Sequence, residues 1–175
     1  LLQWNSNVQD TLRAAASARG IDPGRLLFAP VLPLQQHLTR LAHADLYLDA
    51  WPCNAHTTAG EALWVGVPVV TLVGEVFAQR VAASLLKAVA LDDLICHDPV
   101  AYCERVLALA ADAPQRARLR KHLEEQRSTS TLFDGRGFAR DLEALWRRMW
   151  QRALAGEPPG HLLASLQTQA FEDFQ

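Results

Sequence analysis

Short apolar runs alternate with stretches of helical spacing along this chain. The runs predict five short strands, at residues 1–4, 25–28, 45–48, 67–72 and 94–96. The helical spacing predicts a helix that begins at Thr57 or Thr58, and others at residues 8–18, 34–42, 77–90, 99–111, 113–127 and 138–154. Strands that alternate with helices over short links are typical of βαβ units, so the sequence predicts an α/β fold with a parallel sheet.

The segment between the third and fourth predicted strands holds the main candidate site. It places His56, Thr57 and Thr58 where a helix begins, beside the carboxyl end of a strand. Such a helix start presents unpaired N–H groups and attracts anions, phosphate above all. The pattern therefore favours a phosphorylated or nucleotide ligand, although a threonine at this position is also an ordinary helix cap.

Glu61 lies one helical turn further on, on the same side as Thr57 or Thr58. Its carboxylate could accept two hydrogen bonds from the vicinal hydroxyls of a ribose. Equally, it could be a partner of the helix dipole in the first turn.

A second candidate group follows the second predicted strand. His37 and Arg40 are three residues apart on one helix, and we expect them at the same sheet edge as His56. Together they could contact a base or a phosphate. The alternatives are a partly buried histidine and an arginine that faces solvent.

The composition of the chain argues against several classes of function. Half of the residues are hydrophobic and the formal net charge is -2, which gives no electrostatic reason to expect nucleic acid. Three cysteines without metal-ligand spacing indicate a reducing, cytoplasmic setting without disulfides, and we expect no metal site. Cys53 has no His/Asp partner pattern that would favour a nucleophile. No apolar run is long enough to span a membrane.

The ends of the chain add two expectations. The apolar face of the helix at 138–154 includes Phe138, Trp146 and Trp150, which we expect to pack on a neighbouring element. The tail at 156–175 is predicted to be disordered in part or to form a short helix. Because the chain begins on an apolar run without methionine, we expect it to be a piece of a longer protein.

An ordered set of motifs resembles the C-terminal catalytic lobe of the O-linked N-acetylglucosamine transferase family, with its bacterial and SPINDLY-type relatives. The resemblance covers roughly residues 1–149. The motifs are Phe28-Ala29-Pro30-Val31-x-Pro33-x-x-x-His37-x-x-Arg40, Ala44-Asp45-x-x-Leu48-Asp49, Cys53-Asn54-Ala55-His56-Thr57-Thr58, Leu63-Trp64-x-Gly66-x-Pro68-Val69-Val70-Thr71 and Gly74-Glu75-x-x-Ala78-x-Arg80-Val81-Ala82-Ala83-Ser84.

The resemblance implies a Rossmann-like parallel sheet flanked by helices, over residues 1–155, as the C-terminal lobe of a GT-B fold. It implies the UDP-GlcNAc-binding lobe of an inverting, metal-independent glycosyltransferase that needs no cofactor and modifies Ser and Thr of proteins. SPINDLY-type members of the family transfer fucose instead.

The resemblance also implies roles for seven residues. In it His56, Thr57 and Thr58 match the block that holds the diphosphate, and Glu61 matches an acidic residue for the ribose. The uridine contacts correspond to His37, to Arg40 and to the backbone of Leu32.

Two residues depart from the family pattern. Leu34 replaces a lysine that several relatives have near the nucleotide, and Glu61 is one methylene longer than the aspartate of animal members. The chain also lacks an N-terminal lobe with its acceptor-side histidine, an upstream lysine and tetratricopeptide repeats. We therefore expect no catalytic residue and no transferase activity in this piece alone. The alternative function is a non-catalytic protein-interaction module with a degenerate GT-B lobe.

Overall fold

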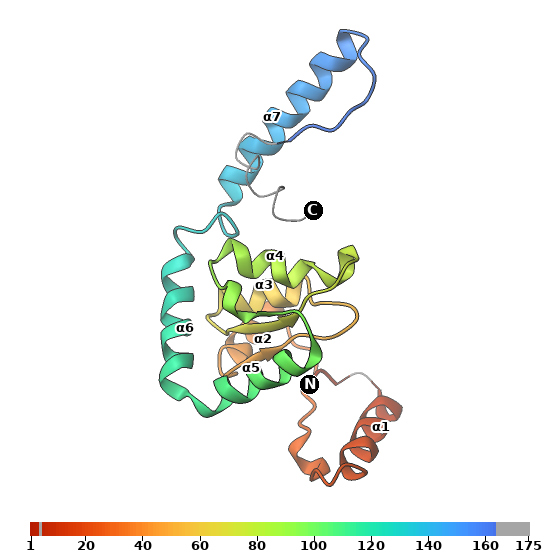
Figure 1. Cartoon of the computed structure of the whole chain (residues 1–175), viewed down its shortest axis with the longest axis vertical. Coiled ribbons are helices and arrows are strands. Elements are labelled where there is room, and N and C mark those ends of the chain that lie inside the picture. The colour runs from red at the N-terminus through yellow and green to blue at the C-terminus, as the bar shows by residue number, and fades with distance from the viewer. Residues whose placement is uncertain (4, 164–175) are drawn as a thin grey trace. The chain divides into compact units, whose positions relative to one another are not determined.

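The structure, a computed structural model, describes residues 1–3 and 5–163. Its backbone forms two compact units, Leu1–Ala44 and Asp45–Gln175 (Figure 1). Each unit is described by itself below. The single lobe expected over residues 1–155 stays a prediction, and most of the predicted tail, residues 164–175, lies outside the described part of the chain.

The first unit contains two helices and an extended segment. Helix α1 spans Ser6–Ser17, a short 3-10 helix spans Pro23–Arg25, and helix α2 spans Leu34–Leu41. Asn5 caps α1 by accepting a 2.9 Å hydrogen bond from the N–H of Val8.

The two strands predicted at 1–4 and 25–28 are reduced to one isolated parallel bridge between Leu2 and Ala29, and Trp4 lies outside the described residues. The turn that begins at Pro23 continues to Leu26, whose N–H bonds the Pro23 carbonyl at 3.1 Å. Pairing therefore begins only at Leu27, whose carbonyl accepts from the Leu1 amino group at 3.0 Å, and it extends to Ala29, whose N–H and carbonyl bond Leu1 and Gln3.

The second unit is built on a parallel sheet, as predicted, and this sheet contains three of the five predicted strands. Strand β1 spans Tyr47–Leu48, β2 spans Val69–Leu72 and β3 spans Ile95–Cys96, in the order β1-β2-β3. Tyr47 pairs with Val69, and Thr71 pairs with Ile95. All three strands therefore end at one sheet edge, from which the loops after β1 and β2 emerge.

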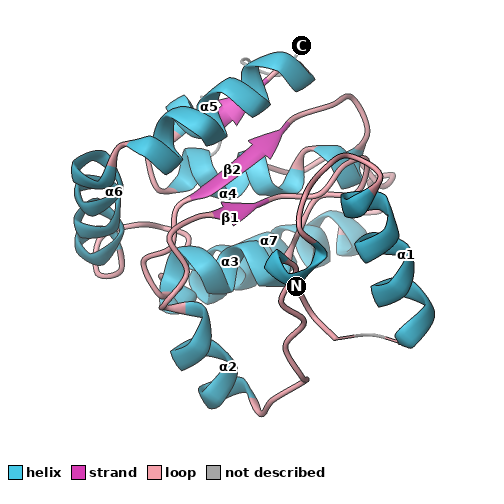
Figure 2. Ribbon diagram, turned by 90° about the horizontal axis from the view of Figure 1, so that it is seen from below, coloured by secondary structure: helices cyan, strands magenta, loops and turns pink. Residues whose placement is uncertain are grey.

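Helices cover both faces of this sheet (Figure 2). Helices α3, Thr57–Trp64, and α4, Val81–Ala88, are the crossovers between strands and lie on one face. Helix α5, Pro99–Ala111, lies on the other face, with Asp98 as its cap. Helix α6, Ala113–Gln126, packs against α3 and α5. Its many charged residues predict a surface helix, but it also buries Leu119 and Leu123.

The predicted helix at 77–90 is divided. A 3-10 helix at Phe77–Gln79 precedes α4, which begins at Val81. The division has a local cause, since the carbonyl of Gln79 accepts from the Gly74 N–H at 3.0 Å and its side chain accepts from the Glu75 N–H at 3.2 Å. These bonds close a compact loop between Gly74 and Gln79 and prevent a regular α-helix there.

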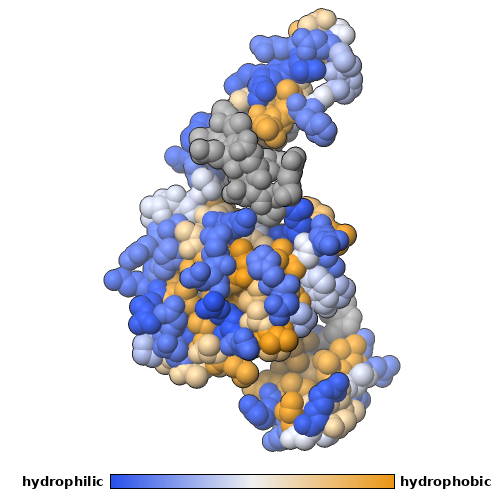
Figure 3. Space-filling view, viewed as in Figure 1, coloured by the Kyte–Doolittle hydropathy of each residue, from blue (hydrophilic) through white to orange (hydrophobic). Residues whose placement is uncertain are grey.

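Helix α7, Gly135–Leu154, differs from the expectation of a packed helix. It begins earlier than predicted because Asp134 caps it through the Gly137 N–H at 2.8 Å. Within the described chain, Phe138, Trp146 and Trp150 remain 69%, 58% and 67% exposed, so the predicted packing of these side chains is absent. Figure 3 shows hydrophobic residues among hydrophilic ones on the visible surface of α7. Among the described residues, no helix combines the length and the apolar character needed to cross a membrane.

We expect the interior of the second unit to be sensitive to truncation. Leu63 has 0% exposure, so Leu63→Ala should lower the free energy of unfolding by about 2–5 kcal/mol because it leaves a cavity. Leu107→Ala is the matched control, since Leu107 is 69% exposed on α5. Urea denaturation of both variants checks this, and equal losses would contradict the assignment of the core.

Candidate functional site

Helix α3 begins at the edge of the sheet with its first residues open to solvent. The helix starts at Thr57, and His56 precedes it with φ -103° and ψ -92° and makes no side-chain capping bond. His56, Thr57 and Thr58 are all exposed. The sequence offered a threonine cap as the alternative to phosphate binding, but both threonines are inside the helix and cap nothing. The first N–H groups of α3 therefore remain available to an anion.

The side chains of this helix start are partly fixed by neighbours. The hydroxyl of Thr58 accepts a 3.0 Å hydrogen bond from the phenol of Tyr47 on β1, which leaves the Thr58 proton free to turn toward a ligand. Glu61 is half-buried one turn later. The structure thus places Thr57, Thr58 and Glu61 on one helix, as the sequence predicted.

An aromatic side chain that the sequence did not single out stands beside His56. The Phe77 ring meets the imidazole edge-on, with centroids 5.8 Å apart and an interplanar angle of 90°. Phe77 is 78% exposed, so an apolar surface adjoins the polar helix start.

The loop that leads into α3 is held by a buried carboxylate. Asp49, 7% exposed, accepts hydrogen bonds from the N–H groups of Ala50 at 2.8 Å and Ala55 at 2.7 Å. Its other oxygen accepts from the Thr71 hydroxyl at 2.6 Å. In the sequence Asp49 is recognisable as the polar residue that ends an apolar run. Which groups donate hydrogen bonds to it can be known only from the fold.

Asn54 anchors the same loop from within. It is 4% exposed; its N–H donates to the Ala78 carbonyl at 2.8 Å and its side-chain amide donates to Ala50 at 3.2 Å and Leu72 at 3.4 Å. Its Oδ1 is buried and has no hydrogen-bond partner among the described residues. The loop after β1 is thereby joined to the loop after β2.

The two loops also fit together sterically. The indole of Trp51 and the side chain of Gln79 lie against the α-carbon of Gly74, where a β-carbon would collide with both. Gly74 is therefore required by close approach and not by backbone conformation.

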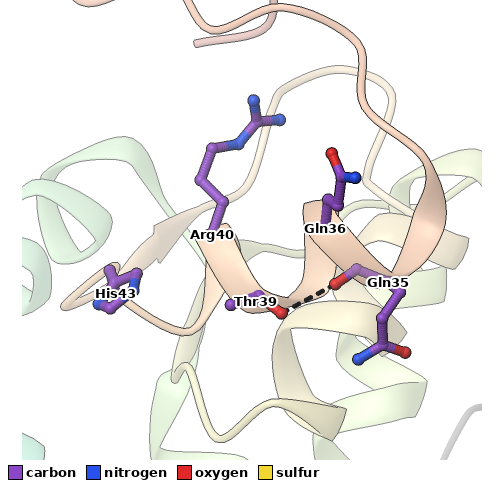
Figure 4. A pocket seen from close by; sticks show the side chains of 5 residues that line it. All are labelled: Gln35, Gln36, Thr39, Arg40 and His43. Carbon is purple, nitrogen blue, oxygen red and sulfur yellow. Dashed lines mark hydrogen bonds between the residues drawn. The ribbon is translucent and has the colours of Figure 1, made fainter.

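A second group of predicted residues lies in the first unit, on α2. The Arg40 guanidinium contacts Nδ1 of His37 at 3.2 Å and donates to the Pro30 carbonyl at 2.8 Å, which fixes the loop that contains Leu32. One side of α2 lines a hollow of about 370 Å³. Gln36 and Arg40 point to the same side of the helix there, while Thr39 donates to the Gln35 carbonyl at 2.9 Å (Figure 4). His37 and Arg40 are paired, as their spacing predicted.

The predicted residues thus fall into two groups, one in each unit. His37 and Arg40 belong to α2, and His56, Thr57, Thr58 and Glu61 belong to α3 and its approach. That both groups face one ligand stays a prediction. Within the described residues there is no group of three or more His, Cys, Asp or Glu side chains that could hold a metal ion.

Comparison with known proteins decides the family. The family model for glycosyl transferase family 41 matches residues 1–142.

The chain belongs to glycosyl transferase family 41.

Its relatives in family 41 are similar over most of this chain. It is 34% identical over 168 residues to a Caenorhabditis elegans UDP-N-acetylglucosamine–peptide N-acetylglucosaminyltransferase, covering 96% of this chain and 15% of the relative. It is 35% identical to the Arabidopsis thaliana protein SEC and 37% identical to SPINDLY of Solanum lycopersicum, covering 92% and 86% of this chain and 17% of each relative. The chain therefore spans about a sixth of these relatives.

A solved structure supports the fold of this family 41 chain. A mutant O-GlcNAc transferase from Thermobaculum terrenum matches with a TM-score of 0.76 and 35% identity, over 85% of this chain and 29% of that chain. The predicted parallel α/β fold of a GT-B lobe is confirmed.

Titration of the Tyr102 phenol tests its position beside Asp49. Its phenol donates to the Asp49 carbonyl at 3.1 Å, and burial first, then the Asp49 charge, raise the pKa of Tyr102 to about 12. Because the folded state favours the neutral phenol, this contribution to stability is complete below the unfolded pKa of about 10 and is lost as the pH rises through about 12.

The check is the ultraviolet absorbance of tyrosinate against pH in the native chain and in Tyr102→Phe. The difference between the two curves isolates Tyr102 from Tyr47. A midpoint of that difference near 10 would contradict the buried environment described for the phenol.

Proposed function

We propose that this chain is the donor-binding lobe of a protein O-GlcNAc transferase that binds UDP-GlcNAc. The observation that carries the proposal is the open start of α3, with His56, Thr57 and Thr58 exposed at the carboxyl edge of a parallel sheet in a family 41 chain. The similarity to UDP-N-acetylglucosamine–peptide N-acetylglucosaminyltransferases of Caenorhabditis elegans and Arabidopsis thaliana supports this donor.

The proposed reaction is a direct displacement without a metal ion. An acceptor Ser or Thr hydroxyl gives its proton to a base and attacks the anomeric carbon, the bond from that carbon to the diphosphate oxygen breaks, and the configuration at that carbon inverts while UDP leaves. The first N–H groups of α3, the Thr57 and Thr58 hydroxyls and the His56 imidazole would stabilise the negative charge that develops on UDP.

Other contacts of the donor follow from the same assignment. Glu61 would accept the ribose hydroxyls, and His37, Arg40 and the Leu32 backbone would contact the uridine. The acceptor peptide and the base would belong to an N-terminal lobe and repeats elsewhere in a longer polypeptide, and the setting would be cytoplasmic.

A second candidate function is a non-catalytic interaction module. Leu34, the first residue of α2, is 60% exposed and presents an apolar surface at the position where the family resemblance implies a lysine. Loss of a cation near the nucleotide would weaken donor binding, and an exposed leucine suits a protein contact better than a phosphate.

Calorimetric titration with UDP tests the two candidates. His56→Ala and Thr57→Ala should each weaken UDP binding about tenfold, because each removes a hydrogen bond to a charged group. Thr129→Ala is the control, since Thr129 is exposed on the same unit and its hydroxyl donates to the Glu125 carbonyl near the end of α6. Unchanged affinity in both site variants would refute the donor site, and no binding by the native chain would favour the interaction module.

A further inference from the structure

The buried contacts of Asp49 have a role beyond the stability of the unit. We propose that Asp49 is a positioning residue that sets the start of α3 for diphosphate binding, an inference that rests on the proposed function. Both of its carboxylate oxygens accept hydrogen bonds inside the unit, from Ala50 and Ala55 on one side and Thr71 on the other. Asp49 therefore acts through the loop and not by contact with the ligand.

The Asp49 side chain closes the loop of residues 50–55 at both ends. The Ala55 N–H that Asp49 accepts lies six residues further along the chain, and the Ala50 N–H lies one residue further. The Thr71 hydroxyl fixes the same carboxylate to β2, where Thr71 has 0% exposure. The last residue before His56 is thereby fastened to the central strand of the sheet.

Helix α3 lacks a side-chain cap. Helices α1, α5, α6 and α7 each begin at a side chain that bonds a first-turn N–H, supplied by Asn5, Asp98, Asp112 and Asp134. Helices α2 and α4 share with α3 the absence of such a bond, and the residue before α3 is His56. An internal cap would occupy the donors that an anion needs. The position of the helix start is held instead one residue earlier, at Ala55.

Tyr102 and Asn54 also hold the loop. Tyr102 donates to the Asp49 carbonyl at 3.1 Å, and Asn54 bonds Ala50, Leu72 and Ala78. These contacts hold the middle of the loop but do not reach the N–H of Ala55. Loss of the Asp49 carboxylate would therefore release the end of the loop next to the binding site while much of the loop stays attached.

The experiment compares Asp49→Ala and Asp49→Asn with the native chain. Asp49→Ala should weaken UDP binding about tenfold or more in calorimetry, because the first turn of α3 becomes mobile. Asp49→Asn should recover much of the affinity, because its amide oxygen can accept from Ala55 and its amide group can donate to the Thr71 hydroxyl. Circular dichroism and thermal melting identify the conditions in which each variant is folded.

Ser130→Ala is the control for a merely structural loss. Ser130 is 6% exposed and donates to the Ala88 carbonyl at 2.7 Å, away from the loop of residues 50–55. A purely structural role for Asp49 predicts that folded Asp49→Ala binds UDP as well as the native chain does, or that Ser130→Ala loses as much affinity. Either result overturns the proposal.

A second measurement separates this proposal from the proposed function. In the ligand-free protein, the NMR amide signals of Ala55, His56 and Thr57 should shift or broaden in Asp49→Ala and stay in place in Ser130→Ala. If the native chain fails to bind UDP, the donor-site proposal fails, and these amide signals decide whether Asp49 positions the helix start. Unchanged signals in folded Asp49→Ala would overturn the positioning role.

Discussion

Strand β2 lies in the middle of the parallel sheet, and its residues Val69, Val70 and Thr71 have no exposed surface. Burial on both faces requires apolar side chains, with one exception that needs a partner. Thr71 is that exception, and its hydroxyl finds Asp49 at the end of β1. The same strand thus supplies the core of the second unit and the attachment for the loop that precedes α3.

The start of α3 combines uncapped N–H groups with a preceding loop that is held in place. The helix leaves its first N–H groups to solvent and to a ligand, which costs the helix a cap. The unit offsets this cost by holding the preceding loop through hydrogen bonds that the Asp49 carboxylate accepts and the Asn54 amide donates. In the proposed donor site, such an arrangement would keep donors in place before the diphosphate arrives, which is the condition for preorganised stabilisation of a leaving group.

Much of this arrangement could be predicted from the sequence, because it depends on local patterns. The strand at Val69–Leu72, the α3 start at Thr57 and the pairing of His37 with Arg40 follow from apolar runs and helical spacing. The failures have one local and one tertiary cause. The helix expected from 77 is interrupted by hydrogen bonds to Gln79, and the contact of Phe77 with His56 joins segments that sequence periodicity cannot relate.

The close approach at Gly74 has a consequence for how such sequences can diverge. The loops after β1 and β2 share one small space, in which Trp51 and Gln79 leave no room for a β-carbon at position 74. Any larger residue there demands a smaller one at position 51 or a different side chain at 79. These three positions are therefore constrained as a set, and substitutions among them should accumulate together rather than one at a time.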